Sequence, residues 1–185
     1  MTYFVDLNFS NFNFNEYGNF CLLKKEEYET LDKALEQAKI NEELSLDSLV
    51  FISEAEAKLN NLEILSGDEF EILKKLKLVY VEKEKGIETM GGMDFIYKKV
   101  VSSFLSSTKE YYDEIINKFN DSIDAYLLFT HSLKGISLNL GSLILYTVTM
   151  HGMKEEYYKK SSFLSFYNEV FKHVYDELEK YSKGN

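Results

Sequence analysis

One segment of this 185-residue chain combines residue types that are suited to phosphoryl chemistry. It runs from Thr130 to Gly141, and within it His131 is followed by Lys134 and Gly135. A neutral imidazole, with an unperturbed pKa of about 6.5, is nucleophilic at one ring nitrogen near neutral pH. On a helix, a lysine three residues further on shares the histidine's face, and its ammonium favours the negative charge of a phosphorylated ring. His131 can therefore accept a phosphoryl group, and the alternative is an ordinary surface histidine on a helix.

The residues around His131 predict a helix with one buried and one exposed face. Spacings of three and four produce an apolar and small-residue stripe that can enter a core: Tyr126, Thr130, Leu133, Ser137 and Leu140. His131 belongs to a different stripe, with Leu127, Leu128 and Leu138, so we expect it to be exposed. These leucines would provide a partner with an apolar contact. Gly135 costs about 1 kcal/mol relative to alanine inside a helix, and its missing side chain lets a partner approach closely.

The string HSLKGISLNLG, from His131 to Gly141, resembles the signature of histidine-containing phosphotransfer (HPt) domains. The match comprises the histidine, the lysine three residues on, the glycine four on, the small Ser137 six on and the glycine ten on. The resemblance covers about residues 87–185. It implies that His131 is phosphorylated on Nε2 and exchanges the phosphoryl group with a receiver-domain aspartate, assisted electrostatically by Lys134.

The resemblance also implies the partners of this chain. These are the receiver domains of response regulators or hybrid histidine kinases, which would dock on four residues, namely Leu127, Leu128, Gly135 and Leu138. The receiver supplies Mg²⁺, so this chain needs no cofactor, and transfer requires mainly positioning and charge stabilisation. The sequence has neither a GxxxxGK[ST] loop nor the glycine boxes of a histidine kinase. We therefore expect a phosphocarrier in a two-component phosphorelay rather than a self-sufficient enzyme.

Two further residues are candidates for a supporting role. Ser137 is a hydrogen-bonding residue or a small core residue that allows tight helix packing. His151 lies close to where some HPt relatives place a polar group that orients the phosphorylated ring, and its alternative is a structural role. A rival function belongs to a different class: a docking or inhibitory module that binds a histidine kinase or receiver, with His131 never phosphorylated.

Composition predicts two domains that divide near residue 86. Residues 1–86 hold 10 lysines and 18 acidic residues, whereas residues 87–185 hold 11 and 13. Short apolar runs and alternation around Phe12 to Leu22 predict strands, and with intervening helical periods they indicate a small α/β domain. Its role is open between a degenerate receiver-like module, a dimerisation module that forms a homo-oligomer, and a sensor-docking domain.

Residues 87–185 predict four helices, which usually pack as an antiparallel bundle when their connections are short. These helices are expected over about 93–119, 120–140, 143–159 and 161–181. The first has a predicted core stripe that includes Ile96, Val100 and Phe104. The last has a longer one: Phe163, Phe166, Val170, Phe171, Val174, Leu178 and Tyr181. The expected fold class is α+β overall, a small N-terminal α/β domain followed by an antiparallel four-helix bundle, of HPt type according to the resemblance.

Charge and composition exclude several function classes. The net charge is −10 and the sequence contains no arginine, so nucleic acid is not an expected partner. No apolar run approaches the length of about 18 residues that a membrane span needs, and the N-terminus does not resemble a signal peptide. The histidines and the single Cys21 match no metal-site spacing, so no bound metal is expected. We expect a cytoplasmic protein.

Overall fold

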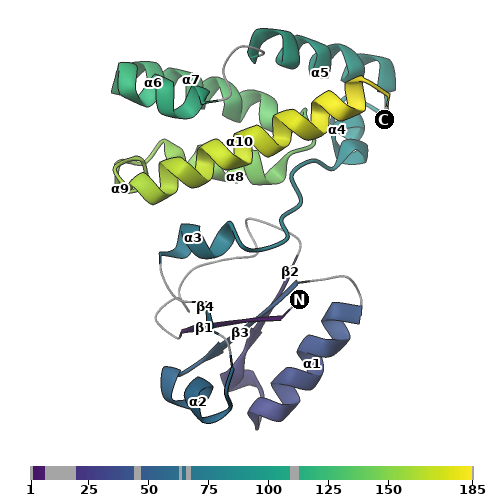
Figure 1. Ribbon diagram of the computed structural model, residues 1–185. Coiled ribbons are helices and arrows are strands. Elements are labelled where there is room, and N and C mark those ends of the chain that lie inside the picture. The colour runs from purple at the N-terminus through teal and green to yellow at the C-terminus, as the bar shows by residue number, and fades with distance from the viewer. Residues whose placement is uncertain are drawn as a thin grey trace. The chain divides into compact units, whose positions relative to one another are not determined.

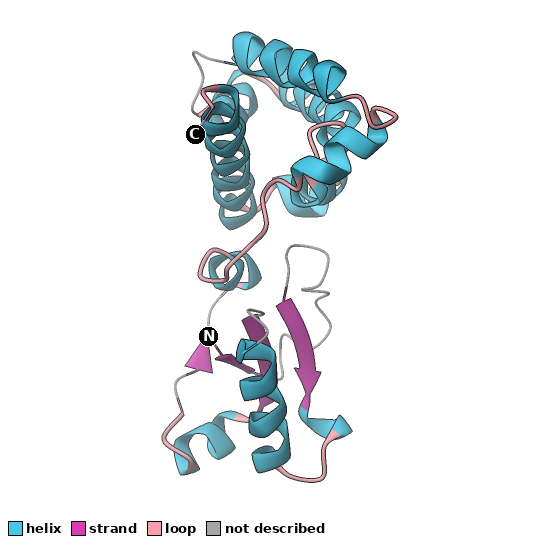
Figure 2. Ribbon diagram, turned by 90° about the vertical axis from the view of Figure 1, so that its right-hand side faces the viewer, coloured by secondary structure: helices cyan, strands magenta, loops and turns pink. Residues whose placement is uncertain are grey.

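The structure is a computed structural model that describes residues 2–6, 20–43, 47–62, 64–65, 68–108 and 113–184. The chain divides into two compact units, Met1–Leu78 and Val79–Asn185. Figure 1 labels the helices and strands of both units. Residue 86, where composition predicts a boundary, belongs to a helix of the second unit, α4 (Lys83–Thr89). The described strands, magenta in Figure 2, all belong to the first unit.

A parallel sheet forms the centre of the first unit. Its strands are β1 (Thr2–Asp6), β2 (Phe20–Lys24), β3 (Asp47–Ile52) and β4 (Ile64–Leu65). They pair in the order β2-β3-β1-β4, and every pair is parallel. A parallel strand covered on both faces is continuously apolar, and the run Leu49 to Ile52 in β3 has no exposed surface. This strand order differs from the 2-1-3-4-5 order of flavodoxin-like folds, which receiver domains share.

Three helices accompany this sheet: α1 (Leu31–Glu43), α2 (Glu54–Leu59) and α3 (Glu69–Leu73). A short 3-10 turn, Lys25–Glu27, follows β2. The core of the unit pairs small helical residues with branched strand residues: Ala34, Ala38 and Ala57 with Leu23, Val50 and Ile52. The first strand of the predicted pair near Phe12 lies outside the described residues. The receiver-like and dimerisation roles of residues 1–86 stay predictions.

The described part of the second unit is helical. After α4 it contains α5 (Asp94–Thr108), α6 (Glu114–Asp121), α7 (Ile123–Ser137), α8 (Leu143–Gly152), α9 (Glu155–Tyr158) and α10 (Ser161–Ser182). The long helix α10 packs against α5, α6, α8 and α9, and α7 packs between α6 and α8. The largest fully buried side chains of this unit are aromatic: Tyr97, Tyr126, Tyr167, Phe163, Phe166 and Phe171.

The predicted fold class is wrong. The sequence was expected to form an α+β chain that ends in an antiparallel four-helix bundle of HPt type, but the described part of the second unit contains seven helices. The stretch 93–119 contains α5 and most of α6, and the stretch 143–159 contains α8 and α9. A helical period continues through such breaks because it reports which face is apolar, not where the backbone turns. At the second break the backbone leaves the helix at Lys154, which is extended (φ −99°, ψ 133°) before α9 begins.

Two absences hold for the described ranges. None of their helices is both long enough and apolar enough to cross a membrane. No three His, Cys, Asp or Glu side chains in these ranges gather closely enough to hold a metal ion.

Candidate functional site

Helix α7 carries the candidate histidine, and its buried face matches the prediction. Ser122 caps the helix, because its Oγ accepts the N–H of Ala125 at 3.0 Å. The five residues predicted to enter the core are all buried: Tyr126, Thr130, Leu133, Ser137 and Leu140. His131 is exposed, as predicted. The orientation of α7 therefore follows from its apolar stripe, and this orientation directs the imidazole away from the core.

Polar groups on the buried face of α7 fix its position against α8 and α10. The Tyr126 hydroxyl donates to the carbonyl of Gly152 at 3.0 Å. The Tyr167 hydroxyl of α10 donates to Thr130 Oγ1 at 3.4 Å, next to His131 in the sequence. Burial raises the pKa of both tyrosines above its usual value, so both hydroxyls keep their protons at neutral pH. Rotation of α7 would break these bonds, and the exposed position of His131 is therefore well determined.

The exposed face of α7 combines one imidazole, one ammonium and an apolar surface. Leu128 is 71% exposed and Leu138 is 42% exposed, and Leu127 is partly buried. In a helix, positions three, four and seven residues apart share a face, so these leucines flank His131 on both sides along the helix. Lys134 is partly buried on the same face. The candidate docking residues predicted from the sequence therefore form one stripe.

The side chains of His131 and Lys134 have no hydrogen bond or ion pair with any other residue in the part of the chain that the structure describes. For Lys134 the sequence explains this, since the positions three and four residues away on either side carry no acid. Several other lysines of this unit are paired with an acid. Lys183 pairs with Glu179 at 2.9 Å, and Lys159 with Glu155, each four residues apart. The charge of Lys134 is thus available to an anion at His131.

The two glycines of the segment have different roles. A Cβ at Gly135 would meet no atom within 4 Å, so packing does not require glycine there. Gly141 has φ +76° and ends α7 in a Schellman motif, with Ser142 N–H donating to Ser137 O at 2.9 Å. A Cβ at Gly141 would lie 2.3 Å from the carbonyl oxygen of Glu82. The backbone conformation therefore requires glycine at position 141, whereas neither backbone nor packing requires it at position 135.

Within the described residues, the side chain of neither predicted supporting residue forms a hydrogen bond with His131: Ser137 is in the core, and His151 interacts with residues of α8 and α9. Ser137 is fully buried, and its hydroxyl donates to Leu133 O at 2.5 Å, so it contributes to the core. His151 of α8 is partly buried, and its Nδ1 donates to Thr147 O at 2.9 Å. Its ring also packs edge-on against Tyr157, with centroids 4.7 Å apart. These contacts give His151 a structural role in joining α8 to α9.

Helix α4 contributes residues to this region that the sequence did not predict to lie there. The N–H of Glu82 donates to Gly141 O at 2.8 Å. A Cβ at Gly86 would lie 3.1 Å from Gly141 N and 2.4 Å from a ring carbon of Tyr97. The backbones of α4 and of the α7–α8 turn therefore approach closely. A glycine inside a charged helix was the signal that could have indicated this contact.

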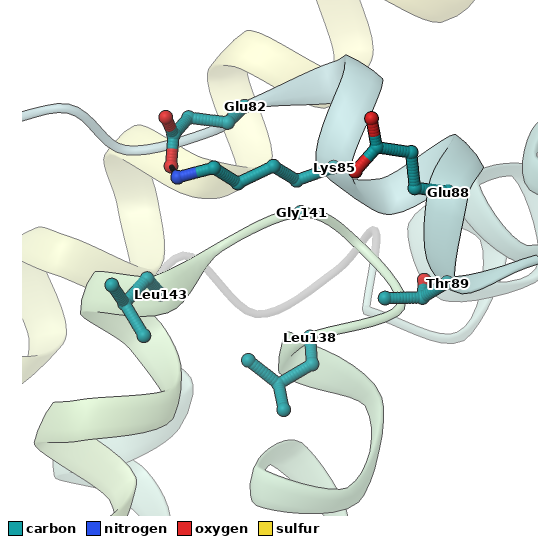
Figure 3. A pocket seen from close by; sticks show the side chains of 7 residues that line it. All are labelled: Glu82, Lys85, Glu88, Thr89, Leu138, Gly141 and Leu143. Carbon is teal, nitrogen blue, oxygen red and sulfur yellow. Dashed lines mark hydrogen bonds and ion pairs between the residues drawn. The ribbon is translucent and has the colours of Figure 1, made fainter.

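An open groove of about 460 Å³ lies where α4 meets the α7–α8 turn. Its lining contains two leucines and a charged rim: Leu138, Leu143, Gly141, Glu82, Lys85, Glu88 and Thr89. Figure 3 shows the two leucines on one side of the turn at Gly141 and the charged α4 side chains on the other. Leu138 belongs to both the groove and the apolar stripe of His131, so the two features are continuous.

Comparison with known proteins adds no family to this description. No family model, no curated protein and no solved structure matches the chain. The resemblance to HPt domains therefore depends on the segment from His131 to Gly141 and on its setting in α7.

Proposed function

We propose that this protein is a phosphocarrier of a two-component phosphorelay in the cytoplasm, in which His131 accepts and donates a phosphoryl group. The observation that carries the proposal is the exposed face of α7. There an exposed imidazole lies beside an uncompensated ammonium, within a stripe of exposed leucines and a glycine that packing does not require. The proposed partners are receiver domains, which hold the phosphoryl group on an aspartate.

The proposed transfer balances without any further reactant. The lone pair of His131 Nε2 attacks the phosphorus of the receiver's aspartyl phosphate, so that a P–N bond forms and the P–O bond to the carboxyl group breaks. The aspartate leaves as a carboxylate, and Nδ1 keeps its proton. Lys134 stabilises the phosphoryl oxygens that arrive next to the ring. The receiver's Mg²⁺ neutralises charge during the transfer.

The exposed leucines and Gly135 support the docking step of the proposal. A leucine that is 71% exposed, such as Leu128, provides apolar surface that a partner can bury. The bare backbone at Gly135 lets the partner reach the helix one turn beyond His131. Because α7 is fixed from its buried face, the imidazole is presented without a change of helix position.

The test is transfer of labelled phosphate from a receiver domain, with Mg²⁺, to the wild-type chain and to His131→Gln. His151→Gln is a matched control, because His151 also precedes a lysine by three residues, Lys154. We expect acid-labile, alkali-stable label on the wild type and on His151→Gln, and none on His131→Gln. Wild-type labelling of His131→Gln would overturn the assignment.

Lys134→Gln tests the electrostatic part of the mechanism. Loss of one nearby positive charge should slow transfer several-fold, which corresponds to a rise of about 1 kcal/mol in the activation free energy. His131 should still become labelled after a long incubation. A receiver that binds the chain but never labels it would instead favour the rival function, a docking or inhibitory module.

A further inference from the structure

The groove beside the α7–α8 turn has walls that are fixed by backbone contacts. Glu82 N–H donates to Gly141 O at 2.8 Å, and the Gly86 N–H donates to Glu82 O at 3.2 Å. Tyr97 also stabilises the turn, because its hydroxyl donates to Leu140 O at 3.1 Å. The open space between α4 and the turn is therefore a formed feature rather than a variable gap.

The groove combines apolar surface with one uncompensated negative charge. Leu138 and Leu143 are 42% and 51% exposed. On the α4 side Glu82 and Lys85 form an ion pair at 2.7 Å and neutralise each other. Glu88 is exposed, and its side chain has no ion pair or hydrogen bond with another residue in the described ranges. The lining of the groove thus includes an exposed carboxylate and two leucines.

This combination is complementary to a lysine or arginine side chain. Such a side chain packs its methylene stem on apolar surface and keeps its charged end at a polar or anionic group. Here the stem would contact the leucines and the cation would reach Glu88. A purely apolar side chain would leave the carboxylate without a partner, and an acidic one would be repelled by it.

The groove is close enough to His131 to be covered by the same partner. Leu138 follows His131 by two helical turns, which corresponds to about 10 Å along α7. A standard interface covers roughly 800 Å² on each partner, a patch roughly 30 Å across. A receiver centred on His131 therefore extends over Leu138 and the groove that it lines.

We propose that this groove binds a lysine or arginine side chain that the receiver presents next to its phosphorylation site, and that this contact selects which receivers dock. The inference rests on the proposed function, since it concerns the same partner. It adds α4, and Glu88 in particular, to the surface that determines specificity.

The test measures binding of receiver domains from the same organism by titration calorimetry. Three variants are compared with the wild type: Glu88→Lys, Leu143→Ser and Glu84→Lys. Glu84 is exposed on the same helix but does not line the groove, so it is a control for net charge. All three positions are exposed, and thermal unfolding checks that each variant keeps the fold.

We expect Glu88→Lys to raise the Kd of a bound receiver about tenfold, Leu143→Ser several-fold, and Glu84→Lys less than about twofold. Reversal of the contacting receiver cation to glutamate should restore binding to Glu88→Lys. Equal affinity of Glu88→Lys and wild type, or equal weakening by Glu84→Lys, would overturn the inference.

Labelling in the same samples separates this inference from the proposed function. If His131 is labelled but receiver binding does not depend on Glu88, the groove inference is wrong and the proposed phosphocarrier function is supported. Binding that depends on Glu88 without label on His131 supports the groove and overturns the phosphocarrier. Absence of binding by every receiver overturns both.

Discussion

The two faces of α7 differ in how completely their polar groups are used. On the buried face the hydroxyls of Tyr126 and Ser137 each donate to a backbone carbonyl. On the exposed face the side chains of His131 and Lys134 make no hydrogen bond or ion pair with another residue within the described ranges. The first face determines where the helix lies, and the second is available to a partner. Substitutions on one face should therefore change stability and on the other should change transfer.

The largest effect is expected from Tyr126→Ala on the buried face. Removal of a fully buried aromatic ring should lower the free energy of unfolding by about 3–5 kcal/mol, measured by equilibrium urea denaturation. His131→Gln, on the exposed face, should change it by less than about 0.5 kcal/mol. A comparable loss in both variants would contradict the separation of the two faces.

The next effect concerns the end of α7. Gly141→Ala should cost about 2 kcal/mol or more, because the left-handed backbone alone costs about 1–2 kcal/mol for alanine and the new Cβ would lie 2.3 Å from Glu82 O. Gly92 also has a positive φ, but a Cβ there meets no atom within 4 Å. Gly92→Ala therefore isolates the backbone cost, and a loss as large as that of Gly141→Ala would show that the α4 contact is unimportant.

The buried tyrosines should make the free energy of unfolding fall at alkaline pH. An unfolded tyrosine ionises near pH 10, whereas burial raises the pKa of Tyr97 to about 12 and also raises that of Tyr126. Above about pH 10 the unfolded chain binds fewer protons than the folded chain, so stability falls as pH rises, by up to about 1.4 kcal/mol per pH unit per tyrosine. Urea denaturation between about pH 9 and about pH 12 measures this slope. Tyr126→Phe should make it shallower, and an unchanged slope would exclude Tyr126 as a contributor.

The smallest effect is a gain on the exposed face. Gly135→Ala should raise the free energy of unfolding by about 0.5–1 kcal/mol, because alanine is the better helix former and its Cβ would meet no atom within 4 Å. A bulkier Gly135→Trp should slow transfer from a receiver without lowering stability, measured with the same labelled donor. A loss of stability in Gly135→Ala would mean that the glycine has a packing role after all.

The sequence predicted the faces of two helices correctly because their stripes depend on local spacing alone. The stripe of α7 is buried as expected, and six of the seven residues in the α10 stripe are buried as well, with Tyr181 the partly exposed exception. The turn was also predictable, since Gly141 adopts a positive φ and Ser142 caps α8. These features need only residues that are near one another in the chain.

Features that depend on distant contacts were missed. In α5 the predicted stripe is shifted by one residue at its start: Tyr97 and Val101 are buried, whereas Ile96 and Val100 are partly exposed. Tyr97 is buried because it contacts Leu140, 43 residues further along the chain, and Gly86 on helix α4. The placement of α4, and with it the groove, depends on the same contacts. The parallel pairing of β1 with β3 likewise joins strands more than 40 residues apart, which no local pattern specifies.

The absence of an acidic neighbour for Lys134 on α7 has a consequence for the rate of encounter. A lysine paired with a glutamate has a short-range field, because the two charges largely cancel. The field of Lys134 instead decays over the Debye length, about 8 Å at physiological ionic strength and longer in dilute buffer. Lys134 therefore attracts an anionic group locally before contact, and its own contribution to the association rate should fall as salt is added, which a comparison of wild type with Lys134→Gln across salt concentrations measures.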